Sequence, residues 1–209
     1  MREEKPDLDT AYALETPDDN RALYAGWAET YDATFAQEMD FLMPGHVARL
    51  FDGHGGDGPV LDAGAGTGLV AGEILRRRAC DIDAFDLSAE MLAVARSKGF
   101  YRRTIEGDLT APLPFATGSY NAVVSSGTFT HGHVGPEALD ELLRVAAPCA
   151  LFVLTIKTEH YDTRGFAGKF AALSPAITGF ETVQLPIYGP GATGDHKDDQ
   201  GVIAVFRKA

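Results

Sequence analysis

The chain has 209 residues, of which 45% are hydrophobic and 23% charged, a composition typical of one globular domain with its own core. The 18 basic and 30 acidic residues give a net charge of −12, which argues against a broad basic surface for nucleic acid or anionic lipid. No apolar run approaches about 18 residues and the N-terminus has no signal-peptide pattern. With only two cysteines, which lack metal-ligand spacing, we expect a cytoplasmic protein that neither enters nor spans a membrane.

The N-terminal part is predicted to form an arm and a helical cap. Residues 1–17 are polar, whereas the aromatic and apolar residues of 18–39 recur every three or four positions, which predicts one or two helices. A further apolar helix is expected over 44–51, and the glycine-rich stretch 52–59 is expected to be a loop.

From residue 60 onward, short apolar strands alternate with helices. The expected strands cover 60–63, 82–86, 100–106, 121–126, 150–156, 180–185 and 201–207. The expected helices cover 69–78, 89–97 with Ser88 as its N-cap, a segment that opens at Pro136, and 164–173. This alternation predicts a mainly parallel sheet with helices on both faces, closed by an antiparallel edge hairpin. We therefore divide the chain into the arm and cap, residues 1–52, and one α/β unit, residues 53–209.

Glycine clusters at one place in the chain. Eight of the 23 glycines lie between residues 53 and 72, and three alternate in the segment Gly64-Ala65-Gly66-Thr67-Gly68, between a predicted strand and a predicted helix. Glycines at such a turn let the backbone approach a nucleoside. Asp86 ends the next strand, where a carboxylate accepts ribose hydroxyls, and Asp108 follows the third strand, where it meets an adenine amino group. The pattern predicts a ligand that contains adenosine.

The spacing of the glycines distinguishes two adenosine cofactors. Dinucleotide sites usually read Gly-x-Gly-x-x-Gly, whereas this loop reads Gly-x-Gly-x-Gly with Asp62 two positions before it. A carboxylate there would repel a pyrophosphate and attract a sulfonium or an ammonium group. The sequence favours S-adenosylmethionine. A nicotinamide-dependent oxidoreductase on a related sheet and a nonenzymatic S-adenosylmethionine-binding protein stay open as alternatives.

These motifs resemble those of the class I S-adenosylmethionine-dependent methyltransferases over about residues 20–209. The resemblance implies a Rossmann-like, seven-stranded α/β fold with an N-terminal helical cap. Segment 27–32 resembles the cap that closes over the cofactor in small-molecule methyltransferases, and segments 125–134 and 141–145 resemble the Williams–Beuren-region methyltransferase-like group. Where the family commonly has Pro-Gly-Gly before the fifth strand, this chain has Pro148-Cys149-Ala150. Spacing and resemblance together imply these cofactor-binding residues: Tyr24, Trp27, Tyr31, Asp62, Gly64, Ala65, Gly66, Thr67, Gly68, Asp86, Leu87, Met91, Asp108, Leu109, Ser125, Ser126 and Gly127.

The candidate catalytic residues are His131 and His133, in a loop after the fourth predicted strand. Two histidines without a third ligand at a recognisable spacing do not predict a metal site, but a histidine near neutral pH can take a proton from an acceptor. The alternative is a pair of loop histidines bonded to backbone. No Asn/Asp-Pro-Pro-aromatic run follows that strand, and the chain is acidic, so we expect a small-molecule methyl acceptor and no nucleic acid. The acceptor atom and the oligomeric state stay open.

Overall fold

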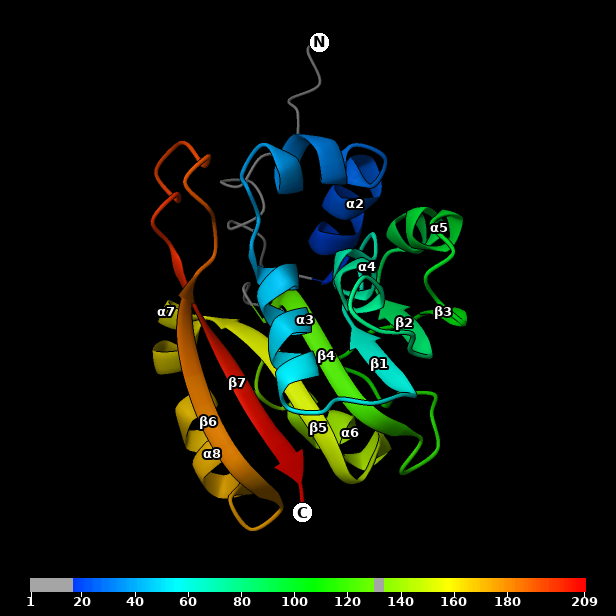
Figure 1. The fold of residues 1–209 in the computed structure, drawn as a ribbon, viewed down its shortest axis with the longest axis vertical. Helices are drawn as coiled ribbons and strands as arrows, with labels where there is room; N and C mark the ends of the chain where they lie inside the picture. The colour runs from blue at the N-terminus through cyan, green and yellow to red at the C-terminus, as the bar shows by residue number, and fades with distance from the viewer. Residues whose placement is uncertain (1–16, 130–133) are drawn as a thin grey trace.

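A computed structural model describes residues 17–129 and 134–209. Its centre is one seven-stranded sheet with the order β3-β2-β1-β4-β5-β7-β6 (Figure 1). The strands are β1 (Val60–Ala63), β2 (Ile82–Asp86), β3 (Arg103–Glu106), β4 (Tyr120–Phe129), β5 (Ala146–Lys157), β6 (Ile177–Pro186) and β7 (Gln200–Lys208). β1 to β5 run parallel, whereas β7 is antiparallel to both β5 and β6. The predicted fold class, including the antiparallel hairpin at the C-terminal edge, is confirmed.

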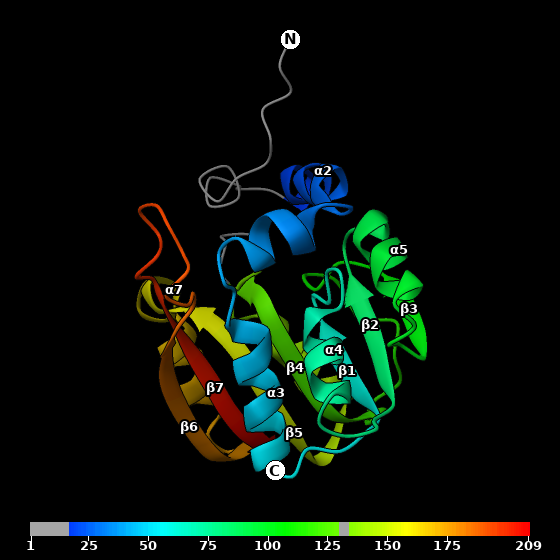
Figure 2. The same cartoon turned by 45° about the horizontal axis from the view of Figure 1, so that its top comes forward.

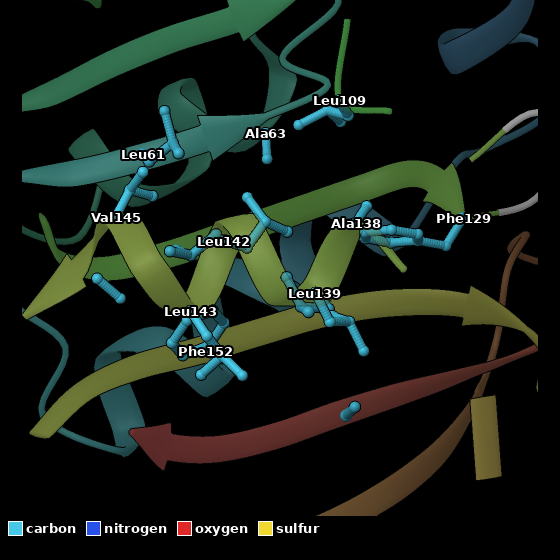
Figure 3. Close-up of a cluster of buried hydrophobic side chains, with 14 of the residues drawn as sticks. Leu61, Ala63, Leu109, Phe129, Ala138, Leu139, Leu142, Leu143, Val145 and Phe152 are labelled. Atoms are coloured by element: carbon cyan, nitrogen blue, oxygen red, sulfur yellow. The ribbon is translucent and has the colours of Figure 1, made fainter. Parts of the chain in front are cut away.

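Helices cover both faces of the sheet because the apolar residues of each strand alternate between two cores. The helices are α2 (Pro17–Trp27), the π-helix η1 (Asp32–Gln37), α3 (Met43–Gly53), α4 (Leu69–Leu75), α5 (Ala89–Ser97), α6 (Ala138–Val145), α7 (Thr158–Thr163) and α8 (Phe166–Leu173). α3 and α4 pack with Ala122 and Val124 on one face, and α6 and α8 pack with Val123 on the other. Figure 3 shows α6 placing Leu142 and its neighbours over β1, β4 and β5.

The parallel strands end beneath the N-terminal helices. Figure 2 shows α2 beyond the carboxyl ends of β1, β2 and β4. The segment after η1 pairs with the connection from β6 to β7: Gly189 N donates to Asp40 O at 2.8 Å, Leu42 N donates to Ile187 O at 2.9 Å, and Phe41 forms an antiparallel bridge with Tyr188. The cap is therefore anchored at its C-terminal end to the edge hairpin.

Most predicted elements are present, with differences at their ends. The bounds predicted for β1, β2 and α5 are those observed, and Ser88 caps α5 by accepting a hydrogen bond from Met91 N at 3.2 Å. The predicted helix 69–78 is wrong in length, since α4 ends at Leu75 and a turn follows. α7 was not predicted, and the boundary expected after residue 52 falls inside α3.

No helix in the described ranges, 17–129 and 134–209, has the length and apolar character that a membrane span requires.

Candidate functional site

A cavity opens at the carboxyl ends of β1, β2 and β4, where the strand order reverses between β1 and β4. Its empty space, including the opening to solvent, is about 910 Å³. The crevice at such a reversal is where open α/β sheets bind ligands. Thirteen of the predicted cofactor residues line it: Tyr24, Tyr31, Gly64, Ala65, Gly66, Thr67, Asp86, Leu87, Met91, Asp108, Leu109, Ser126 and Gly127.

The glycine loop presents bare backbone to this cavity. Gly64 and Gly66 have φ angles of +73° and +52°, a left-handed conformation that side chains disfavour. A Cβ atom on Gly64 would lie 1.9 Å from Thr128 Oγ1, whereas a Cβ on Gly66 would meet nothing within 4 Å. The space over Gly66 is thus a cradle that a side chain would fill.

The Asp86 carboxylate is held in a fixed orientation at the end of β2. Its Oδ1 accepts from Ser88 N at 2.9 Å and its Oδ2 accepts from Gly66 N at 2.7 Å. Burial raises the pKa of Asp86 above its ordinary value, and these backbone hydrogen bonds act in the opposite direction. A carboxylate accepts about four hydrogen bonds, so Asp86 retains capacity for a hydrogen bond from a ligand hydroxyl beside those from Gly66, Leu87 and Ser88.

After β3, Asp108 Oδ1 accepts from Thr110 N at 2.8 Å and from Thr110 Oγ1 at 2.7 Å. This turn fixes the carboxylate at the edge of the cavity that Leu109 also lines. The arrangement suits a carboxylate that accepts a hydrogen bond from an exocyclic amino group.

Asp62 lies behind the glycine loop and is not among the residues that line the cavity. Its side chain is wholly buried, and its Oδ2 accepts from the Tyr101 hydroxyl at 2.7 Å. Burial raises the pKa of Asp62 to about 7, and the Tyr101 hydrogen bond lowers it by less. Within the described part of the chain, Asp62 Oδ1 has no hydrogen-bond partner. Direct contact of Asp62 with the cofactor therefore stays a prediction.

Sequence reasoning did not identify Tyr101. Its ring also supports the loop, since a Cβ atom on Gly68 would lie 2.9 Å from Tyr101 Cε2. Gly68 itself is the N-cap of α4 and lies outside the cavity lining. No local pattern marks Tyr101, because its partner is 39 positions away.

Aromatic side chains form the cap wall of the cavity. Tyr24, Tyr31 and Phe41 line the cavity. Trp27 does not, because it is buried behind them, with ring centroids 6.2 Å from Tyr24 and 5.2 Å from Tyr31. Trp27 Nε1 donates to Thr34 Oγ1 at 3.1 Å. The structure thus places Trp27 as a support for the wall.

The end of β4 contributes two serines with different surroundings. Ser125 is buried, and its Oγ donates to Ala63 O at 2.6 Å, which joins β4 to β1. Ser126 lines the cavity, and its buried Oγ has no partner among the described residues. A polar atom of a ligand would complete that hydrogen bond. The candidate bases His131 and His133 lie outside the described residues, and in the described ranges no group of three or more metal-ligating side chains occurs.

The site is similar to known proteins in sequence and in fold. Residues 60–149 match a family model described as a methyltransferase domain. Methyltransferase-like protein 27 of Homo sapiens is 32% identical over 139 residues, which are 65% of this chain and 56% of that protein. Malonyl-[acyl-carrier protein] O-methyltransferase of Pectobacterium atrosepticum is 39% identical over 115 residues, which are 55% of this chain and 41% of that protein. The chain therefore spans about half the length of the curated relatives it matches.

A solved structure described as the DhpI-SAH complex has the same fold, with a TM-score of 0.64 at 20% identity over 92% of this chain and 97% of that chain. In sequence and in fold the chain is therefore similar to class I S-adenosylmethionine-dependent methyltransferases. The resemblance to methyltransferase-like proteins is confirmed. S-adenosylmethionine is the cofactor of this methyltransferase fold, and the cradle over Gly66, the fixed Asp86 carboxylate and the unpartnered Ser126 hydroxyl fit it.

Proposed function

We propose that the protein transfers a methyl group from S-adenosylmethionine to a small-molecule acceptor. The observation that carries the proposal is the Asp86 carboxylate, fixed by Gly66 N at 2.7 Å across a cavity at the reversal of strand order. S-adenosylmethionine supplies a methyl group already activated on a sulfonium. The task left to this chain is to bind, orient and exclude water.

Each part of the cavity wall has a role in this proposal. Asp86 accepts the ribose hydroxyls, Asp108 accepts from the adenine amino group, and the backbone at Gly66 passes close to the nucleoside. Tyr24 and Tyr31 exclude water from the reacting end. Orientation of two reactants contributes ~7–11 kcal/mol at its best, so these positioning residues supply most of the rate enhancement. His131 and His133 stay the candidate general bases.

The charge of the wall supports a small acceptor rather than a nucleic acid. Arg21 is the single lysine or arginine among the described residues that line the cavity, and the whole chain carries a net charge of −12. A nucleic-acid acceptor requires several cations for its phosphates. The aromatic wall of Tyr24, Tyr31 and Phe41 suits an acceptor with apolar surface that is enclosed by the cap. The printed name of the bacterial relative describes an acyl group on a carrier protein as that enzyme's substrate, so carrier-bound acceptors belong in the test.

Cofactor binding is tested by thermal unfolding with S-adenosylhomocysteine, S-adenosylmethionine or NAD. At 100 times Kd a ligand adds about 2.7 kcal/mol, which raises Tm by roughly 5–10 °C for a chain of this size. We expect this shift with both adenosyl compounds and none with NAD. Asp86→Ala should abolish the shift, whereas the exposed Asp52→Ala, a matched loss of one carboxylate, should retain it. A shift with NAD alone would overturn the proposal and favour the alternative of a nicotinamide-dependent oxidoreductase.

Turnover is tested by measuring S-adenosylhomocysteine release in the presence of pooled small metabolites and of acylated carrier protein. Release that depends on one small molecule supports the proposal. Release with the carrier-bound acceptor alone would replace the free acceptor with a carried one. Binding of S-adenosylmethionine without turnover on any acceptor would indicate a nonenzymatic binding protein.

A further inference from the structure

Asp32 joins the cap to two other parts of the cavity wall. Its Oδ1 accepts from Thr67 Oγ1 at 2.5 Å, and its Oδ2 pairs with the Lys98 ammonium. Asp32 begins η1 in the cap, Thr67 belongs to the glycine loop, and Lys98 follows the last residue of α5. We call Asp32, Thr67 and Lys98 the Asp32 junction. Its partners lie 35 and 66 positions from Asp32 along the chain.

The junction connects two walls that a bound cofactor would lie between. Tyr31, which precedes Asp32, lines the cavity from the cap side, and Gly66, which precedes Thr67, lines it from the loop side. Gly66 N also holds the Asp86 carboxylate. Because neighbouring residues of one chain move together, the cap cannot draw Tyr31 away from the loop without breaking the hydrogen bond between Asp32 and Thr67.

The two ends of the cap are attached by different kinds of contact. Near Phe41 the attachment is a backbone pairing with the β6–β7 connection, in which Gly189 N donates to Asp40 O and Leu42 N donates to Ile187 O. At Asp32 the attachment is made by side chains. Backbone hydrogen bonds are retained when single side chains change, whereas side-chain contacts break one at a time. The backbone end is suited to act as a hinge and the Asp32 end as a latch.

The burial of the junction strengthens it. Thr67 is 1% exposed, and the side chains of Lys98 and Asp32 are 22% and 38% exposed. The hydrogen bond to Asp32 therefore lies in a partly desolvated place, where hydrogen bonds to charged groups are stronger than those on an open surface.

We propose that Asp32 is a positioning residue that latches the cap onto the glycine loop and so sets the rate at which the cofactor leaves. The inference rests on the proposed function for the identity of that cofactor. Asp32 itself does not line the cavity, so it acts through Tyr31 and Thr67. Loss of the latch should speed cofactor exchange with little change in the stability of the sheet.

The chain carries its own reporter for this test. Trp27 is its single tryptophan, and its ring packs edge-on against Tyr31 at a centroid distance of 5.2 Å. Displacement of S-adenosylhomocysteine by excess S-adenosylmethionine, followed by Trp27 emission in a stopped-flow instrument, gives the dissociation rate constant. Acrylamide quenching of Trp27 in the ligand-free protein reports how far the cap opens.

We expect Asp32→Ala and Thr67→Val each to raise the dissociation rate constant roughly 10-fold to 100-fold, the range for loss of a hydrogen bond to a charged group. Thr67→Ser, which keeps the hydroxyl, should restore the wild-type rate. Asp32→Asn keeps an acceptor for Thr67 but loses the charge that pairs with Lys98. Its dissociation rate constant should therefore lie between that of the wild type and that of Asp32→Ala. Glu29→Gln, a matched change at an exposed cap residue, should have no effect.

The combined variant Asp32→Ala with Thr67→Val separates a latch from general damage. Asp32→Ala and Thr67→Val remove the same hydrogen bond. The dissociation rate constant of the combined variant should therefore match that of Asp32→Ala and should not show the product of the two single effects. Unchanged rates in Asp32→Ala and Thr67→Val, or failure of Thr67→Ser to restore the rate, would overturn the latch. If wild-type protein does not bind S-adenosylhomocysteine, the proposed function fails. Equal quenching of Trp27 in the ligand-free wild type and in ligand-free Asp32→Ala would overturn the latch separately.

Discussion

Replacement of Asp62 by asparagine should make the folded protein more stable at neutral and alkaline pH. The Asp62 side chain is wholly buried in β1 and receives one hydrogen bond, from Tyr101, on Oδ2. Asparagine has nearly the same shape, and its carbonyl oxygen also accepts from Tyr101. The substitution therefore removes a buried ionisable group while the packing of β1 is retained.

The size of the effect follows from the pKa of Asp62, which burial raises from 3.8 to about 7. Between these pH values the folded protein keeps a proton that the unfolded chain has released, so wild-type stability falls as pH rises from about 4 to about 7. Each pKa unit corresponds to about 1.4 kcal/mol, which gives a loss of about 4 kcal/mol that is complete above pH 7. Asp62→Asn has no such titration. The amide N–H that replaces Oδ1 costs about 1–3 kcal/mol at every pH, so the pH-dependent part is the diagnostic one.

Urea unfolding of ligand-free wild type and Asp62→Asn, at intervals from pH 4 to pH 8, measures this difference. The free energy of unfolding of the variant minus that of the wild type should rise by about 4 kcal/mol across the range. Tyr101→Phe, which removes the one donor to Asp62, should steepen the wild-type decline. The exposed Asp52→Asn serves as the control and should give a flat difference. A flat difference for Asp62→Asn as well would refute the reasoning, since it would mean that Asp62 titrates alike in the folded and unfolded chains.

Other substitutions separate folding from binding. Gly66→Ala should cost about 1 kcal/mol of stability because of its left-handed φ. It should weaken the binding of S-adenosylhomocysteine at least about 10-fold, because its Cβ enters open space at the cavity wall. Gly64→Ala, whose Cβ would meet Thr128 at 1.9 Å, should lower Tm even without ligand. Cys149 has a φ of +64°, so Cys149→Gly should raise the free energy of unfolding, measured with urea, by about 1 kcal/mol. Cys149→Ala, which keeps a Cβ, should not raise it. Burial alone would raise the pKa of Asp83, but hydrogen bonds from two arginines and a tyrosine lower it to about 2. In the wild type, about 2 kcal/mol of stability should therefore be present above pH 4 and lost as the pH falls toward 2. Urea unfolding of Asp83→Asn should lack this pH-dependent stability.

Elements with strong local signals could be predicted from the sequence, and elements without them could not. β1 and β2 are apolar runs that end at glycine or aspartate, and Ser88 marks the start of α5, so their bounds agree with the structure. α7 has six residues and none of them is buried, so no apolar period reveals it. β4 and β5 are longer than predicted because residues at their ends are ordered by pairing across the sheet, as Tyr120 is with Ala146 and Phe129 is with Ile156.

The candidate site shows the same division. The glycine loop and Asp86 are recognised because the loop directly follows β1 and Asp86 is the last residue of β2. The contacts of Asp32 with Thr67 and of Asp62 with Tyr101 could not be predicted, since they join residues 35 and 39 positions apart and depend on how the backbone places them. The aromatic stripe predicted a cap helix, but the helical period alone does not decide which rings turn inward, and Trp27 and Phe35 are the ones that are buried.

β7 lies between β5 and β6 although it is synthesised after both. β7 has nine residues. Until they have left the ribosome, one edge of β5 is unpaired. β6 then also lacks its strand partner, since it pairs with β7 in the described sheet. The segment that holds the hinge of the cap follows β6 directly, so it gains a fixed position at the same moment. Unpaired apolar edges are the surfaces through which nascent chains aggregate. A chain in which β7 is not yet synthesised would therefore have an open sheet and a cap without its backbone pairing, so β7 completes the sheet and fixes the cap together.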